Sequence, residues 1–138
     1  MSKTTIEFAG GMRFEGRGGS GHKVVMDASA KSGGADEAAR PVETFLCALG
    51  ACTGMDVIAI LRKMKSPLEA LTIQIDDERA EDYPQVFTAI HLTYRIRGRI
   101  PRDRVVKAVD LSLSKYCPIA NSLAGVAEIT SEIVIEPG

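Results

Sequence analysis

The sequence predicts an α+β fold in which antiparallel sheets pack around one long, central, apolar helix. The first observation is a run without any charged side chain between Glu43 and Asp56, which describes a helix that is apolar on every side. The second is a period-two alternation of apolar and polar residues before and after this run, typical of half-buried strands. The third is the length of 138 residues, which suits one domain with a real core. Because one sheet and one further helix cannot cover such a helix, we expect a homodimer.

The first forty residues predict short strands separated by glycine turns. Ile6 and Phe8, then Met12 and Phe14, alternate with polar or small residues. A third short strand follows in the segment HKVVMDAS, so a hairpin or meander is expected. Residues 29–40 are small and polar, and we expect them to form the loop that leads into the central helix.

The central helix is predicted from Pro41 to Met64. Proline suits the first turn of a helix, and the basic residues near the end of this segment suit its last turn. Gly50 and Gly54 provide no packing surface, so another part of the molecule is expected to approach the backbone there. The uncharged run is too short to span a bilayer, and no membrane partner is expected.

The second half of the chain predicts two strands, two helical pieces and a closing strand. The side chains expected to face the core of the sheet are Leu71, Ile73, Ile75, Ile90, Leu92, Tyr94 and Ile96. This one-sided pattern indicates an antiparallel sheet with one covered face. A helix is predicted after Pro101, a break near Cys117 because Pro118 removes a backbone donor, and a shorter helical piece that ends at Gly125. The closing strand is EITSEIVIE.

The composition excludes several classes of function. Seventeen Lys and Arg against eighteen Asp and Glu give a net charge of −1, and there is no tryptophan, so a nucleic-acid partner is not expected. The N-terminal residues lack the apolar run of a signal peptide, and three cysteines do not fit a disulfide framework, which predicts a cytoplasmic protein with reduced thiols. The cysteines and histidines lack metal-ligand spacing, so we expect no metal and no other cofactor.

The cysteines are the first candidates for chemistry. Cys47 and Cys52 lie five residues apart on one helix, hence on faces about 140° apart, and we do not expect them to bond to each other. Cys47 has apolar neighbours and is expected to be a small core side chain. Cys117 precedes Pro118 at an expected helix start, where backbone amides lower the pKa of a thiol. On the residues alone, Cys52 and Cys117 are either reactive thiols or buried, inert ones.

Charged side chains are the second set of candidates. An arginine near Cys52 would stabilise its thiolate, and a carboxylate could hold that arginine in place. Among the arginines we expect Arg13, ahead of Arg17 and Arg79. The full set of charged candidates is Arg13, Arg17, Arg40, Glu43, Asp56, Glu78 and Arg79. The alternative is that these are solvated surface charges.

Three segments together resemble one known family: PVETFLCALGACTGMDVIAIL, ERAEDYPQVFTAIHLTYRIRG and AVDLSLSKYCPIANSL. They are similar to the OsmC/Ohr family, the osmotically inducible and organic hydroperoxide resistance proteins, and most similar to its YhfA-like branch. The resemblance covers nearly the whole chain, so residues 1–138 are expected to be a single OsmC-like domain. It implies an intertwined homodimer with the two long helices at its centre.

The resemblance also implies thiol peroxidase chemistry. It assigns Cys52 as the cysteine that attacks peroxide and Cys117 as its resolving partner. Arg13 and Glu43 complete the expected catalytic set, although each lies one residue beyond the position that the family's hydroperoxide reductases use. On a helix a one-residue shift turns the side chain by about 100°.

The function expected from these residues is defence against oxidative stress. Cys52 is oxidised to a sulfenic acid by an organic hydroperoxide, Cys117 condenses with it to a disulfide, and an external dithiol reduces that disulfide. Two alternatives remain open at this point. One is a protein that binds an apolar small molecule at the dimer interface, and the other is a redox sensor without turnover.

Overall fold

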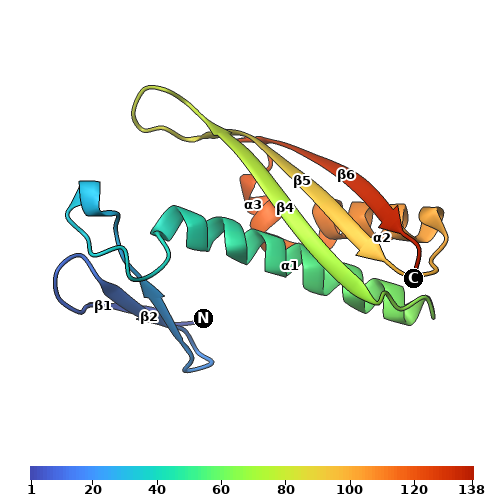
Figure 1. The fold of residues 1–138 in the computed structure, drawn as a ribbon, viewed down its shortest axis with the longest axis horizontal. Coiled ribbons are helices and arrows are strands. Elements are labelled where there is room, and N and C mark those ends of the chain that lie inside the picture. Colours follow the sequence, from blue (N-terminus) through green and yellow to red (C-terminus); the bar gives the residue numbers. More distant parts are fainter. The chain divides into compact units, whose positions relative to one another are not determined.

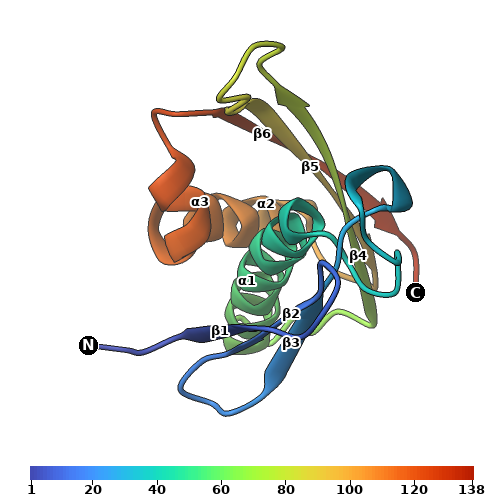
Figure 2. The same cartoon turned by 90° about the vertical axis from the view of Figure 1, so that its left-hand side faces the viewer.

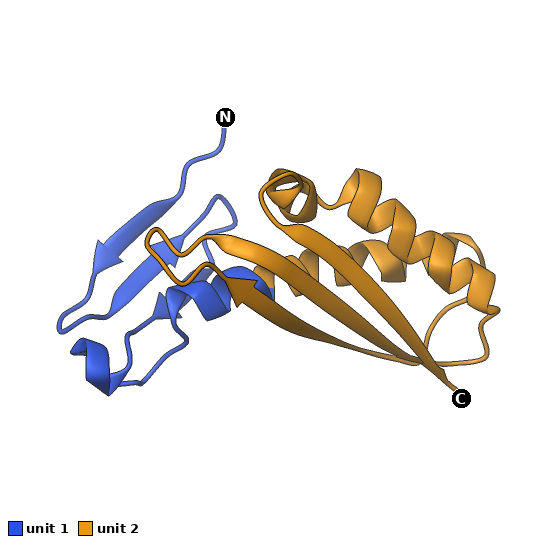
Figure 3. Ribbon diagram, turned by 90° about the horizontal axis from the view of Figure 1, so that it is seen from above, with its two compact units in different colours: residues 1–47 blue, residues 48–138 orange.

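The computed structural model describes residues 1–138, which form two compact units, residues 1–47 and 48–138 (Figure 3). Helix α1 (Pro41–Lys63) begins in the first unit and continues into the second. Its bounds agree with the predicted central helix. That the two units together make a single OsmC-like domain remains a prediction.

The first unit contains a three-stranded antiparallel meander of β1 (Thr5–Phe8), β2 (Phe14–Arg17) and β3 (Lys23–Met26) (Figure 2). Phe14 of β2 lies opposite Phe8 on one side and opposite Met26 on the other. Because side chains alternate along a strand, this register collects the apolar side chains on one face of the sheet. The predicted meander is confirmed.

That apolar face is open in the single chain. Its exposed fractions are 54% for Ile6, 64% for Phe8, 39% for Phe14 and 47% for Val24. The opposite face is polar and carries an ion pair of 2.9 Å between Lys23 and Glu15. The sheet is therefore amphipathic, and its apolar face lacks a cover within its own unit.

The loop between β3 and α1 contains the short 3-10 helix η1 (Ala30–Ser32) and is tied back to the end of β3. The carboxylate of the buried Asp27 accepts hydrogen bonds from the backbone amides of Ala28 at 2.7 Å and Glu37 at 3.2 Å. These bonds favour the charged form and lower the pKa of Asp27.

The second unit contains the sheet β4 (Ala70–Arg79), β5 (Phe87–Arg97) and β6 (Glu128–Glu136), with β5 in the middle. β4 and β5 are antiparallel, as predicted, but β5 and β6 are parallel. The reason is the helical connection that consists of α2 (Arg102–Leu111), η2 (Ser112–Tyr116) and α3 (Pro118–Leu123). It returns the chain to the starting end of β5 before β6 begins. The helices of this unit lie on one face of the sheet (Figure 1).

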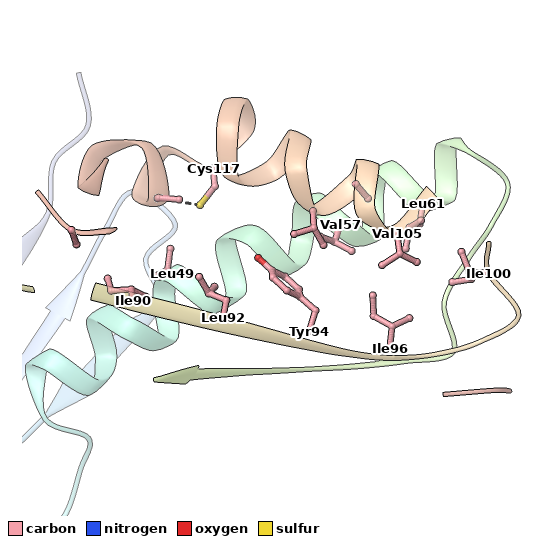
Figure 4. Close-up of a cluster of buried hydrophobic side chains, with 14 residues drawn as sticks. Leu49, Val57, Leu61, Ile90, Leu92, Tyr94, Ile96, Ile100, Val105 and Cys117 are labelled. Carbon is pink, nitrogen blue, oxygen red and sulfur yellow. Dashed lines mark hydrogen bonds between the residues drawn. The ribbon is translucent and has the colours of Figure 1, made fainter. Parts of the chain in front are cut away.

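The core lies between this sheet and the helices (Figure 4). The predicted inward residues of β5 are all fully buried, and they pack with buried side chains of α1 and α2: Ile90, Leu92, Tyr94, Ile96, Leu49, Val57, Leu61, Val105 and Val109. α1 approaches β4 through its glycines. A Cβ at Gly54 would lie 3.1 Å from Cδ1 of Ile73, and one at Gly50 would lie 3.3 Å from Cδ1 of Ile75. The predicted close approach at both glycines is confirmed.

The apolar part of α1 extends beyond its uncharged run. Its 23 residues include a window of mean hydropathy 1.9, enough by length and composition to cross a bilayer, and only 28% of that window is buried in the chain. The core helix of a globular protein meets the same test. Leu49, Thr53, Val57 and Leu61 bury one stripe of α1 in the chain's own core. We therefore interpret α1 as a core helix that one chain covers only in part.

Candidate active site

Cys117 lies at a sharp break between two helical segments. α2 (Arg102–Leu111) continues into the π-helical turn η2 (Ser112–Tyr116), and α3 (Pro118–Leu123) begins directly after Cys117. Cys117 itself is extended, with φ −79° and ψ 107°. Its backbone amide donates to the carbonyl of Ser112 at 2.8 Å, which closes the turn. The predicted break before Pro118 is confirmed.

The Cys117 thiol is the N-cap of α3 and is fully buried (Figure 4). Its sulfur accepts a hydrogen bond from the backbone amide of Ala120 at 3.4 Å. The sequence predicted that this position lowers the pKa of the thiol, and that prediction is wrong. Burial raises the pKa of Cys117 and outweighs the amide contact, and the neighbouring Cys52 raises it further.

Cys52 and Cys117 are brought together, although 64 residues separate them in the sequence. Cys52 is half-buried on α1 and packs against the core cluster that contains Cys117. The two thiols are close enough for Cys52 to affect the titration of Cys117. Both are free thiols in the second unit, and Cys52 is the more accessible of the two.

Cys47 does not join this pair. It belongs to the first unit and is exposed, so the expected core position is wrong for the single chain. Its helical phase differs from that of Cys52 by about 140°, as the spacing predicted.

A buried hydroxyl network lies beside the two cysteines. The hydroxyls of Thr53 and Tyr94 are 2.7 Å apart, and those of Thr53 and Ser112 are also 2.7 Å apart. The Ser112 hydroxyl donates to Oδ2 of Asp56 at 2.8 Å. Burial raises the pKa of Tyr94 to about 12, so its phenol stays protonated around neutral pH.

Sequence reasoning missed this network, although one signal was available. Tyr94 was predicted to face the core, and a buried tyrosine hydroxyl usually needs a hydrogen-bond partner. Thr53 directly follows Cys52, and Ser112 precedes Cys117 by five residues. No local pattern could have paired Thr53 with Ser112, because the contact joins residues 59 apart in the sequence.

Arg13 and Glu43 lie in the first unit, each with a partner there. The guanidinium of Arg13 is 3.6 Å from a carboxylate oxygen of Glu37. Glu43 accepts from the backbone amide of Arg40 at 3.2 Å and from its side chain at 3.4 Å, which caps the start of α1. Their expected support of Cys52 remains a prediction.

The other two candidate arginines also have local contacts. Arg17 donates to the carbonyl of Gly21 at 3.4 Å. The guanidinium of Arg79 lies 6.0 Å from the centre of the Phe87 ring. Each contact holds the arginine side chain within its own hairpin, β2–β3 for Arg17 and β4–β5 for Arg79.

A cavity of about 480 Å³ opens beside the hydroxyl network, with Asp56 in its wall. It lies between α1 and the α2–η2 segment, and its lining residues are Asp56, Ala59, Ile60, Lys63, Met64, Lys107, Leu111 and Tyr116. Most of these side chains present carbon, and two lysines add positive charge. The cavity can therefore accept a molecule with an apolar part and an anionic group.

Comparison with known proteins places the chain near one family. The family model described as "OsmC-like protein" matches residues 33–132. The chain is 36% identical to protein YhfA of Escherichia coli strain K12 over 126 residues, which covers 91% of each sequence.

Solved structures share the fold. An OsmC-like protein of unknown function from Vibrio cholerae superposes with a TM-score of 0.79 at 17% identity, covering 97% of this chain and 99% of that one. An organic hydroperoxide resistance protein OsmC from Legionella pneumophila gives a TM-score of 0.72 at 16% identity, covering 97% and 96%. At such identities the likeness establishes the α+β fold alone.

Proposed function

The chain belongs to the OsmC-like family, and on that premise we propose that it is a thiol-dependent peroxidase that reduces organic hydroperoxides. The observation that carries the proposal is the meeting of Cys52 on α1 with Cys117 at the start of α3. A structural role alone does not require two free thiols side by side, one of them accessible. The names of the Legionella neighbour and of a further neighbour from Elizabethkingia anophelis, both organic hydroperoxide resistance proteins, support the same chemistry.

The first step assigns the attack to Cys52. Its thiolate attacks one oxygen of the hydroperoxide, so that a sulfur–oxygen bond forms and the oxygen–oxygen bond breaks. The alkoxide that leaves takes up a proton and becomes an alcohol, and Cys52 becomes a sulfenic acid. Cys117 is the poorer candidate for this step because it is fully buried and its raised pKa keeps it protonated.

The second step assigns the resolution to Cys117. Its sulfur attacks the sulfur of the Cys52 sulfenic acid, the disulfide forms, and the hydroxyl group leaves with the Cys117 proton as water. An external dithiol then reduces the disulfide by exchange and is itself oxidised to a disulfide. Arg13 and Glu43 are proposed to support the Cys52 thiolate.

Organic hydroperoxides are the favoured substrate class for a physical reason. The helix that carries Cys52 is apolar around most of its circumference, and Cys52 packs against the apolar core cluster. An apolar tail gains about 25 cal/mol for each Å² that it buries, and hydrogen peroxide has no such tail.

Peroxide consumption with a dithiol reductant tests the proposal directly. Cys52→Ser should abolish consumption of cumene hydroperoxide, whereas Cys117→Ser should permit one attack and then leave Cys52 open to over-oxidation. Cys47→Ser is the matched control on the same helix and should behave as wild type. Wild-type consumption by Cys52→Ser would overturn the peroxidase proposal. Reversible Cys52–Cys117 oxidation without turnover would leave the redox-sensor alternative in its place.

We also propose that the protein is a homodimer. Each chain exposes the apolar face of the β1–β2–β3 sheet and leaves much of α1 uncovered. A second copy has the same two unfilled surfaces, and closed two-fold assembly would cover both at once.

Phe8→Glu places a charge on the exposed apolar face, and it should shift the protein from dimer to monomer in light scattering at micromolar concentration. Thr5→Glu introduces the same charge on the polar face of the same strand and should leave the dimer intact. A wild-type protein that scatters as a monomer of about 15 kDa would contradict the homodimer.

A further inference from the structure

We propose that Ser112 is a positioning residue that holds the turn carrying Cys117 against the helix carrying Cys52. The inference rests on the proposed function for its kinetic consequence only. Its thermodynamic consequence, the readiness with which the two thiols form a disulfide, holds for any role of the pair.

Ser112 is bonded to both halves of the thiol pair. Its carbonyl accepts the backbone amide of Cys117 at 2.8 Å. Its hydroxyl lies 2.7 Å from the hydroxyl of Thr53, the residue directly after Cys52. Two hydrogen bonds and one peptide bond therefore connect the backbone at Cys117 to the backbone at Cys52.

The α1 side of this connection is itself held in place. The Ser112 hydroxyl also donates to Oδ2 of Asp56, one helical turn beyond Cys52, at 2.8 Å. The Thr53 hydroxyl meets the Tyr94 hydroxyl of β5 at 2.7 Å. The network thus joins η2, α1 and β5 at one point.

Because the three hydroxyl groups are buried, their hydrogen bonds to one another cannot be replaced by hydrogen bonds to water. Ser112, Thr53 and Tyr94 are all fully buried, so water cannot replace a lost partner. A buried polar group left without a partner destabilises the folded state, so the chain strongly favours the arrangement that keeps the hydroxyls together. That arrangement is also the one in which Cys117 lies beside Cys52.

The turn η2 needs such a tether. π-helical turns are rare, appear mostly as single turns and occur often at functional sites. A disulfide requires its two Cβ atoms to lie about 3.5–4.5 Å apart, so its formation depends on where this turn holds Cys117. The Ser112 hydroxyl is the group that fixes the position of this turn on α1.

The test is Ser112→Ala, with Ser114→Ala as the matched control. Ser114 lies on the same turn, but its hydroxyl is exposed and only bonds back to the Asp110 carbonyl at 2.6 Å. Equilibration of each folded protein in glutathione redox buffers gives the effective concentration of the Cys52–Cys117 pair. We expect roughly a tenfold fall for Ser112→Ala, the equivalent of one lost hydrogen bond, and no change for Ser114→Ala. Equal values for the two variants would overturn the inference.

A second pair of variants distinguishes the loss of the hydroxyl bridge from a general loss of folding. Thr53→Val keeps the shape of the side chain and removes the hydroxyl, whereas Thr53→Ser keeps the hydroxyl. The thiol equilibrium should fall with Thr53→Val and return towards the wild-type value with Thr53→Ser. If Thr53→Val has the wild-type equilibrium, the hydroxyl bridge does not position the pair and the inference fails.

The kinetic readout separates this inference from the peroxidase proposal. In Ser112→Ala the first attack on hydroperoxide should proceed at the wild-type rate, while disulfide closure slows roughly tenfold and dimedone traps more Cys52 sulfenic acid. Wild-type protein that reacts with peroxide, combined with an unaltered closure rate in Ser112→Ala, would overturn the positioning role alone. Wild-type protein that never reacts with peroxide would overturn the peroxidase proposal, and the glutathione equilibrium would still decide the role of Ser112.

Discussion

The two three-stranded sheets of this protein are alike in pattern and opposite in burial. Both alternate apolar and polar side chains, and each gathers its apolar residues on one face. In the second unit that face is covered by helices of the same unit, and the inward residues of β5 are completely buried. In the first unit the corresponding face, with Ile6 and Phe8, is exposed.

The difference shows that binary patterning specifies a buried face without specifying what buries it. A strand pattern of period two tells which side chains turn inward. It does not tell whether the cover comes from the same chain or from a second copy. The first unit satisfies its pattern only if something outside that unit covers its sheet, and the proposed homodimer supplies such a cover.

The largest expected effect is the loss of stability when a buried side chain of the second unit is shortened. Leu92→Ala should lower the free energy of unfolding by about 2–5 kcal/mol, because it leaves a cavity in a fully buried core. Ile6→Ala removes a side chain of similar size from the exposed face of the first unit. If a second copy covers that face, Ile6→Ala should cost clearly more than the roughly 0.5 kcal/mol of a surface substitution, and the loss should grow as the protein is diluted.

Urea unfolding at several protein concentrations measures both effects. A surface-like cost for Ile6→Ala at all concentrations would mean that the apolar face of the first unit stays open in solution. The two sheets would then differ in burial in solution in the same way as they do in the single chain.

Alkaline pH should act on the second unit through Tyr94. The pKa of Tyr94 is raised from its ordinary value of 10.0 to about 12, so the stability linked to its neutral form is complete below pH 10.0 and is lost as pH rises towards 12. The loss approaches about 2–3 kcal/mol at the upper end of this range. Thermal unfolding of wild type and Tyr94→Phe between pH 9 and pH 12 should converge as pH rises, since phenylalanine has no proton to lose. A constant difference across that range would show that Tyr94 ionises as easily in the folded state as in the unfolded chain.

Most of the chain from α1 onward could be predicted from the sequence because its cues are local. Proline at the start of α1, proline after Cys117 and the alternation along β5 each specify an element or its end. The parallel pairing of β5 with β6 could not be predicted in the same way. It depends on where the α2–η2–α3 connection returns the chain, which no pattern within β6 encodes.

In the candidate site, too, local features could be predicted from the sequence, and features that depend on distant contacts could not. Cys52 and Cys117 were identified from helix phase, a proline and family resemblance. The sign of the Cys117 pKa shift was predicted wrongly, because the local cue, an amide at a helix start, is weaker than burial in a core that assembles from distant segments. Ser112 was missed for a similar reason, since its importance comes from Thr53 on another helix.

The smallest expected effect concerns acid pH and the first unit. The carboxylate of Asp27 accepts hydrogen bonds from the amides of Ala28 and Glu37, which connects the end of β3 to the following loop and lowers the pKa of Asp27 below its ordinary value of 3.8. A group with a lowered folded pKa contributes stability above its unfolded pKa and loses it as pH falls through the folded value. Below about pH 4, the loop between β3 and α1 should therefore loosen, while the second unit stays folded. The hydrogen-exchange protection factor of the Glu37 amide, its rate relative to the unfolded chain at the same pH, measures this loosening, and Asp27→Asn should show a lowered protection factor already at pH 7 with little further change in acid. A protection factor that is the same at pH 7 and pH 3 in the wild type would mean that a contact other than the Asp27 carboxylate holds the loop in place.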